Sequence, residues 1–167
     1  RGSMSDAVGL VVNPCGELHG GRGNPESVLM DCLTACTFLR RSAVTVFGSV
    51  AEWGTAMLNA TCGWNLTTKD WPDLAQRTSY MERCYSIREG YRPERDDTLP
   101  DRFFEETIYQ KYGRPMVLDR AKFLEQRAIL YAAYGLNPQG LPPQDALKRL
   151  GLEFTIPTLE KAIGHWA

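Results

Sequence analysis

One long helix with well-marked ends most constrains how this chain can fold. Thr67-Thr68-Lys69-Asp70 resembles a capping box, in which a Thr and an acid three residues later satisfy the first N–H groups of a helix. Buried-face positions then recur at helical spacing, at Leu74, Arg77, Met81, Cys84 and Ile87. Gly90 follows Arg88-Glu89 and suits a helix C-terminus. The sequence therefore predicts a helix that ends near Glu89.

Further helix signals lie on both sides of this one. Asn24-Pro25-Glu26 predicts a helix start, because Asn caps helices and Pro suits the first turn. That helix is expected to carry Val28, Leu29, Leu33, Cys36 and Phe38 toward a core. Other helices are predicted over 46–59 and 119–134, with shorter ones after Pro142 and Ile156. Strand-like alternation is nearly absent, and residues 43–46 are its best candidate, so the predicted fold class is an all-α, irregular multi-helix bundle.

The chain divides into three parts by composition. Residues 1–3 are interpreted as an expression scar before Met4. Residues 4–24 are rich in Gly and are predicted to be a loop segment, whereas 25–167 are predicted to form a single helical domain. Between Tyr91 and about Gly113 we expect a long charged loop, of the kind that packs on a partner or carries function.

Overall charge and cysteine content exclude several classes of function. The net charge of −1 argues against a nucleic-acid surface, which needs concentrated Lys and Arg. No apolar run approaches the roughly 20 residues that cross a bilayer, and no signal peptide follows Met4. The five cysteines are an odd number without the pattern of a disulfide scaffold. We therefore expect a cytoplasmic protein with reduced thiols, no nucleic-acid partner and no membrane partner.

Asp31 and Cys36 are the sharpest candidates for chemistry. Five helical steps rotate by about 140°, so these side chains would not share one helix face and could serve two neighbouring ligands. The structural alternative is that Cys36 is a small buried residue and Asp31 a solvated acid or local cap. Both interpretations stay open at the level of the residues.

Other titratable residues give weaker signals. His19 and His165 are the only histidines, and neither has a Cys or an acid at the spacing of a zinc motif. Asp96 and Asp97 lie near Arg92 and Arg95 and could form an acid/base site. The favoured interpretation is that these acids and arginines neutralise one another and cap helices.

Four ordered motifs stand out along the chain: "LNATCGWNLT" at 58–67, "REG" at 88–90, "DDTLP" at 96–100 and "YAAYGLNPQGLPPQDALKRLGL" at 131–152. Together they resemble motifs of the tungsten-containing aldehyde:ferredoxin oxidoreductase family, which includes the tungsten subunit of certain benzoyl-coenzyme A reductases. The resemblance covers roughly residues 26–164 and only the family's C-terminal helical region. It implies a fold like the C-terminal helical domains of that family.

The resemblance also implies roles for the two candidate residues. Asp31 to Cys36 matches the family's Asp-x-x-Gly-Leu-Cys, in which the acid hydrogen-bonds the pterin and the Cys gives the last thiolate of a [4Fe-4S] cluster. By this likeness Asp31 binds the cofactor and Cys36 is a metal ligand. Thr34 and Ala35 replace Gly and Leu, and Asn24 stands where the family has a Lys that could meet the cofactor phosphates.

The family assignment implies a part of an enzyme. The complete enzyme would carry a tungsten (or molybdenum) bis-pterin and a [4Fe-4S] cluster, and would interconvert aldehydes and carboxylic acids, or reduce a related acyl substrate, with a ferredoxin-type carrier. Its N-terminal half, or a separately encoded subunit, would be the partner of this chain. We expect the isolated chain to hold neither cofactor, to be inactive and to self-associate through an open apolar face. The alternative is a non-catalytic helical interaction module derived from that family.

Overall fold

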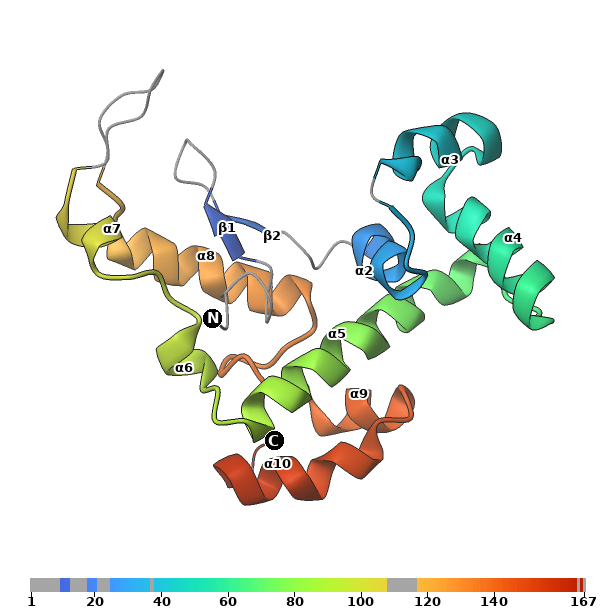
Figure 1. The fold of residues 1–167 in the computed structure, drawn as a ribbon. Coiled ribbons are helices and arrows are strands. Elements are labelled where there is room, and N and C mark those ends of the chain that lie inside the picture. Colours follow the sequence, from blue (N-terminus) through green and yellow to red (C-terminus); the bar gives the residue numbers. More distant parts are fainter. Residues whose placement is uncertain are drawn as a thin grey trace.

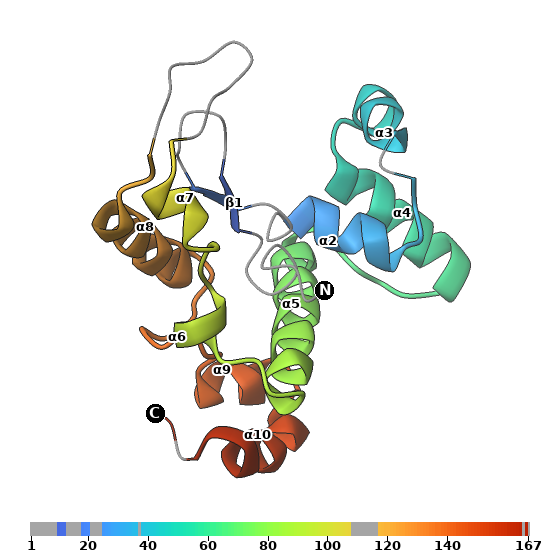
Figure 2. The same cartoon turned by 60° about the vertical axis from the view of Figure 1, so that its left-hand side comes forward.

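The long helix α5 (Trp71–Arg88) runs through the middle of the molecule (Figure 1). The computed structural model describes residues 10–12, 18–20, 25–36, 38–107, 117–164 and 166. At the N-terminal end of α5 lie α2 (Pro25–Cys32), α3 (Leu39–Phe47) and α4 (Val50–Cys62), and along another side of it lie α9 (Gln144–Arg149), η2 (Glu153–Thr155) and α10 (Ile156–Ile163). The remaining side holds α6 (Pro93–Asp96), α7 (Arg102–Glu105) and α8 (Arg120–Ala133), as Figure 2 shows. The predicted all-α class is confirmed.

Two short strands accompany the helices. β1 (Leu10–Val12) and β2 (Leu18–Gly20) pair antiparallel, with Val11 opposite His19. Both strands fall within the segment predicted as a Gly-rich loop, and β2 lies beside α8. The pair is too small to form a layer, and the core clusters consist of residues from the helices and from the segments next to them.

The predicted ends of α5 are confirmed in detail. The Thr67 N–H donates to Asp70 Oδ2 at 2.7 Å, which completes the capping box at the short helix η1 (Thr68–Asp70). The helix continues from there to Arg88. Asp119 likewise caps α8, because its side chain accepts a 3.1 Å hydrogen bond from the Lys122 N–H.

The region between α2 and α4 differs from the prediction. The single helix predicted over 46–59 is two helices, because the Ser49 side chain accepts from the Glu52 N–H and starts α4 after a break at Gly48. Residues 43–46, the best strand candidate, lie inside α3, in keeping with the predicted all-α class. Phe38 is 93% exposed and not part of a core. Two short helices, α6 and α7, interrupt the predicted loop, whose last residues lie outside the described ranges.

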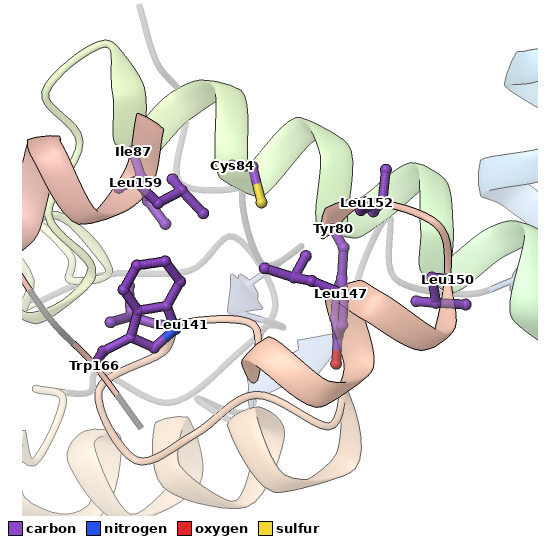
Figure 3. Packing of buried hydrophobic residues seen from close by; sticks show 9 residues of the cluster. All are labelled: Tyr80, Cys84, Ile87, Leu141, Leu147, Leu150, Leu152, Leu159 and Trp166. Carbon is purple, nitrogen blue, oxygen red and sulfur yellow. The ribbon is translucent and has the colours of Figure 1, made fainter. Parts of the chain in front are cut away.

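Two apolar clusters hold the ends of α5. The larger cluster lies between α5, α9 and α10, and Figure 3 shows Leu147 and Leu159 directed toward Cys84 and Ile87. The other lies under α2 and α4 around the buried side chains of Met30, Val50 and Trp71. Burial of apolar surface at both ends therefore fixes α5 as the common support of the fold.

A buried ion pair joins α5 to the segment that follows it. Arg83 and Asp97 are 1% and 0% exposed, and Arg83 Nη1 donates to Asp97 Oδ1 at 3.1 Å. The Tyr131 hydroxyl donates to Asp97 Oδ2 at 2.6 Å, and Tyr91 also donates to this carboxylate. These contacts connect α5, α6 and α8 at one point. The sequence alone did not predict that Asp97 is buried, because the adjacent Asp96 is the same residue type in the same local pattern.

Gly140 completes the environment of this ion pair. Its carbonyl accepts from Arg83 Nε at 2.9 Å and from Nη2 at 2.8 Å. The backbone has φ +74°, and an added Cβ would lie 2.7 Å from Tyr131 Cζ. Only glycine meets both demands, the left-handed conformation and the close approach of the two side chains.

Asp97→Asn tests the buried pair. The variant leaves the Arg83 guanidinium buried without its counter-ion, and we expect a loss of about 3–5 kcal/mol in the free energy of unfolding. The neighbouring Asp96→Asn is the control, because its partner Arg95 is exposed and a surface pair contributes up to about 1 kcal/mol. Urea unfolding followed by circular dichroism measures both. Equal losses of stability in the two variants would contradict the role of Asp97 as the buried counter-ion of Arg83.

The buried tyrosines predict destabilisation at alkaline pH. Burial raises the pKa of Tyr80 from its usual 10.0 to about 12. Burial and the Asp97 carboxylate also raise the pKa of Tyr91 and Tyr131. Because the folded state favours the neutral phenols, their stabilisation is complete below pH 10 and is lost as the pH rises above it. Melting temperatures across this range should fall less steeply for Tyr80→Phe than for the parent chain, and equal slopes would count against the linkage.

Candidate functional site

The candidate site begins where α2 ends. The Ala35 N–H donates to the Met30 carbonyl at 2.9 Å, and the Thr34 N–H donates to the Asp31 carbonyl at 3.0 Å. These two bonds form a Schellman motif, which satisfies the last carbonyls of the helix and turns the chain away from its axis. Ala35 and Met30 belong to the same apolar cluster, which supports the turn.

Thr34 occupies the left-handed position of this motif. Its φ is +53°, and it is the only non-glycine residue with positive φ among the described residues. A β-branched side chain is costly there, and glycine is the residue that such turns prefer. Glycine is also what the motif resemblance implies at this place, and it would suit the left-handed backbone that Thr34 adopts here.

Asp31 and Cys36 lie on opposite sides of this turn, and both are exposed. Asp31 is in the last turn of α2, whereas Cys36 follows the helix and is not carried into the core as predicted. The geometric argument for a continuous helix through Cys36 therefore does not apply. The two side chains still do not share a helix face, because the turn after Asp31 directs the chain away from the helix axis before it reaches Cys36.

The other cysteines occupy different environments. Cys32 Sγ lies 3.7 Å from Thr78 Oγ1 on α5, whereas Cys62 is exposed at the end of α4. Cys84 is buried, and burial raises the pKa of its thiol, so it suits a structural role. Within the described ranges, no three His, Cys, Asp or Glu side chains form a group that could hold a metal ion. Cys15 and His165 lie outside these ranges, and only the backbone of His19 is described.

An apolar groove, which sequence analysis did not predict, adjoins the end of α2. It has a volume of about 480 Å³, its floor is α5, and its walls come from the ends of α2 and α4 and from η2. Trp64, Met81 and Phe154 line it and are exposed. We call this surface, with its lining residues Leu29, Cys32, Leu33, Leu58, Trp64, Trp71, Leu74, Arg77, Thr78, Met81, Glu82, Leu152 and Phe154, the α5 groove.

No membrane-crossing segment is found in the described part of the chain, where every helix is too short or too polar to span a bilayer.

The site consists of an exposed carboxylate and an exposed thiol on either side of a strained turn, beside an apolar groove. Such a surface can supply individual ligands to a group that other residues complete.

Thr34→Gly tests the turn. Replacing Thr at a left-handed position relieves strain of about 1–3 kcal/mol, partly offset by the greater freedom of glycine in the unfolded chain. We expect a net gain of about 1 kcal/mol in the free energy of unfolding, measured by urea denaturation. Thr45→Gly inside α3 is the control and should destabilise, since glycine disfavours helix interiors. A loss of stability in Thr34→Gly would contradict the assigned conformation.

Comparison with known proteins places the chain in a family. Residues 25–152 match the family model described as aldehyde ferredoxin oxidoreductase, domains 2 and 3. Tungsten-containing aldehyde ferredoxin oxidoreductases from Pyrococcus horikoshii and Pyrococcus abyssi are each 32% identical to the chain over 127 residues, and that from Pyrococcus furiosus is 31% identical over 126. These matches cover 75–76% of this chain but 19% of each relative, so the chain spans about a fifth of their length. The chain therefore belongs to the aldehyde ferredoxin oxidoreductase family, and the likeness is to its C-terminal helical region.

Proposed function

We propose that this chain is the C-terminal helical part of a tungsten-pterin, [4Fe-4S] oxidoreductase that interconverts aldehydes and carboxylic acids with a ferredoxin-type electron carrier. The observation that carries the proposal is the Asp31–Cys36 turn. Asp31 and Cys36 are both exposed, and Thr34 keeps a left-handed backbone where the family has glycine. The turn supports the proposal because it presents an accessible carboxylate and an accessible thiol on either side of a backbone held by two hydrogen bonds.

The residues present fit a share of the cofactor site and not the whole. An iron–sulfur cluster needs several thiolates, and Cys36 offers one accessible sulfur. Asp31 offers carboxylate oxygens that can accept hydrogen bonds from a pterin ring. We propose that the N-terminal half of the same enzyme, or a separate subunit, supplies the other ligands.

In this proposal the protein contributes position and charge. When bound, the metal cofactor supplies the two-electron exchange between aldehyde and acid. Asp31 would orient the pterin by accepting hydrogen bonds from its ring. Cys36 would hold the neighbouring cluster, and the turn at Thr34 fixes the two groups relative to each other. The exposed thiols of Cys32, Cys36 and Cys62 suit a reducing, cytoplasmic compartment.

The alternative function is that of a non-catalytic helical interaction module. The α5 groove favours it, because large exposed apolar side chains beside a cavity are typical of protein contact surfaces. The two functions differ in whether the thiol of Cys36 is needed for iron.

Iron content separates the two proposals. The chain would be produced together with the remaining part of the Pyrococcus horikoshii relative, and the purified complex analysed for iron, tungsten and brown colour. The oxidoreductase proposal expects iron in stoichiometric amount, lost in Cys36→Ala and retained in Cys32→Ala, the matched control at the end of the same helix. A complex that forms without iron would favour the interaction module.

The isolated chain gives a second measurement. We expect it to contain neither iron nor tungsten in stoichiometric amount after anaerobic purification. Stoichiometric iron that disappears in Cys36→Ala would show instead that this chain completes a metal site by itself, and the proposal of a shared site would be wrong.

A further inference from the structure

Helix α3 is covered on one narrow side only by the described part of the chain. It packs on α4 at the periphery of the molecule (Figure 1), and Ala43 is its one buried residue. An isolated helix of nine residues is marginal in water, so its stability depends on packing against its neighbours. Because the described chain covers so little of α3, this helix has surface to offer to a partner.

One side of α3 is apolar and open to solvent. Leu39 and Val46 are seven residues apart, which is close to two helical turns, so they lie on the same side of the helix. Their side chains are 47% and 73% exposed, and Phe38, which immediately precedes the helix, is 93% exposed. We call Phe38, Leu39 and Val46 the α3 face. Large apolar side chains that are exposed next to one another are typical of protein contact surfaces.

The α3 face adjoins the thiol of the candidate site. The Leu39 N–H donates to the Cys36 carbonyl at 2.8 Å. Phe38 is two residues from Cys36, so the Cα atoms of these two residues are at most about 7.6 Å apart. In the proposed function another polypeptide segment supplies the remaining thiolates of a cluster, which holds its sulfur ligands close together. A segment that reaches Cys36 in this way also comes within reach of Phe38 and Leu39.

We propose that the α3 face binds the polypeptide segment that supplies the other ligands of the cluster. This inference rests on the proposed oxidoreductase function, which requires such a segment. The chain spans 19% of each Pyrococcus relative, so most of the polypeptide of those proteins lies outside the matched part and can cover the face. The charge of the region suits this occupant, because residues 36–51 include Arg40 and Arg41 and no acid, whereas the thiolates of a cluster are anions.

Val46→Glu tests the α3 face. The full chain would be produced together with the tagged remaining part of the Pyrococcus horikoshii relative, and the amount of chain recovered through the tag measured under anaerobic, reducing conditions. Val46→Glu would bury an unpaired charge in an apolar contact, so the recovery should fall at least about tenfold.

Val44→Glu is the matched control. Val44 lies in the same helix and is 45% exposed, but two helical steps direct its side chain about 200° away from that of Val46. This variant should leave the complex intact. Phe38→Ser, which lies outside the helix, repeats the test without adding a charge to α3. Circular dichroism melting of each isolated variant confirms that it is folded.

The iron content of the complex tests the proposed function separately. A recovery that Val46→Glu leaves unchanged, or that Val44→Glu lowers equally, would overturn the assignment of the α3 face. An iron-containing complex of this kind would leave the oxidoreductase proposal intact. A complex that depends on Val46 but holds no iron would have the opposite meaning, because the face would then bind its partner without the proposed cluster.

Two other occupants of the α3 face are tested with the isolated chain. A parent chain that is not recovered with the tagged part would overturn the proposal. A dimer in sedimentation velocity that Val46→Glu dissociates would then assign the face to a second copy of this chain. Flotation with vesicles of phosphatidylcholine and phosphatidylserine, if the same variant abolished it, would assign the face to a membrane surface.

Discussion

The fold depends on the buried contact between Arg83 and Asp97. An ion pair with exposures of 1% and 0% is stable only when its remaining hydrogen-bonding groups are satisfied, and here Tyr91, Tyr131 and the Gly140 carbonyl satisfy them. The partners come from segments far apart in the sequence. Because the cost of leaving any one of them unpaired is high, the pair fixes the positions of α6 and α8 relative to α5. The apolar clusters toward the two ends of α5 pack around the same helix.

Local sequence signals predicted the helices whose ends they mark. Thr67 with Asp70, and Asp119, act on backbone groups within three residues, so their effect is readable without the fold. Long-range burial was not readable. Asp96 and Asp97 are adjacent and chemically identical, yet one is a partly exposed cap and the other is fully buried. The difference in burial depends on the contacts of Asp97 with Arg83 and Tyr131. Both partners are distant in the sequence, so the residues around Asp97 do not reveal these contacts.

The roles of Asp31 and Cys36 stay a prediction, whereas the predicted shape of the segment that carries them differs from the structure. Asp31 and Cys36 followed from a resemblance between motifs, whereas a continuous helix through Cys36 was wrong because a Schellman turn ends α2 first. The usual sequence signal for such a turn is a glycine, and this chain has Thr34 instead. A left-handed Thr is rare enough that no residue-based rule would predict it. The surrounding apolar contacts of Met30 and Ala35 hold the conformation that the side chain disfavours.

The site and the α5 groove share one structural element, the end of α2. Cys32 faces the groove near Thr78, while Asp31, one residue earlier, is exposed in the same helical turn. Successive residues on a helix point about 100° apart, so a molecule in the groove and a group beside Asp31 would contact the same turn from different sides. Whatever fills the groove therefore restrains the segment that carries Asp31 and, through the strained turn at Thr34, Cys36. The α5 groove and the candidate residues Asp31 and Cys36 therefore both adjoin the end of α2, although one surface is apolar and the other polar.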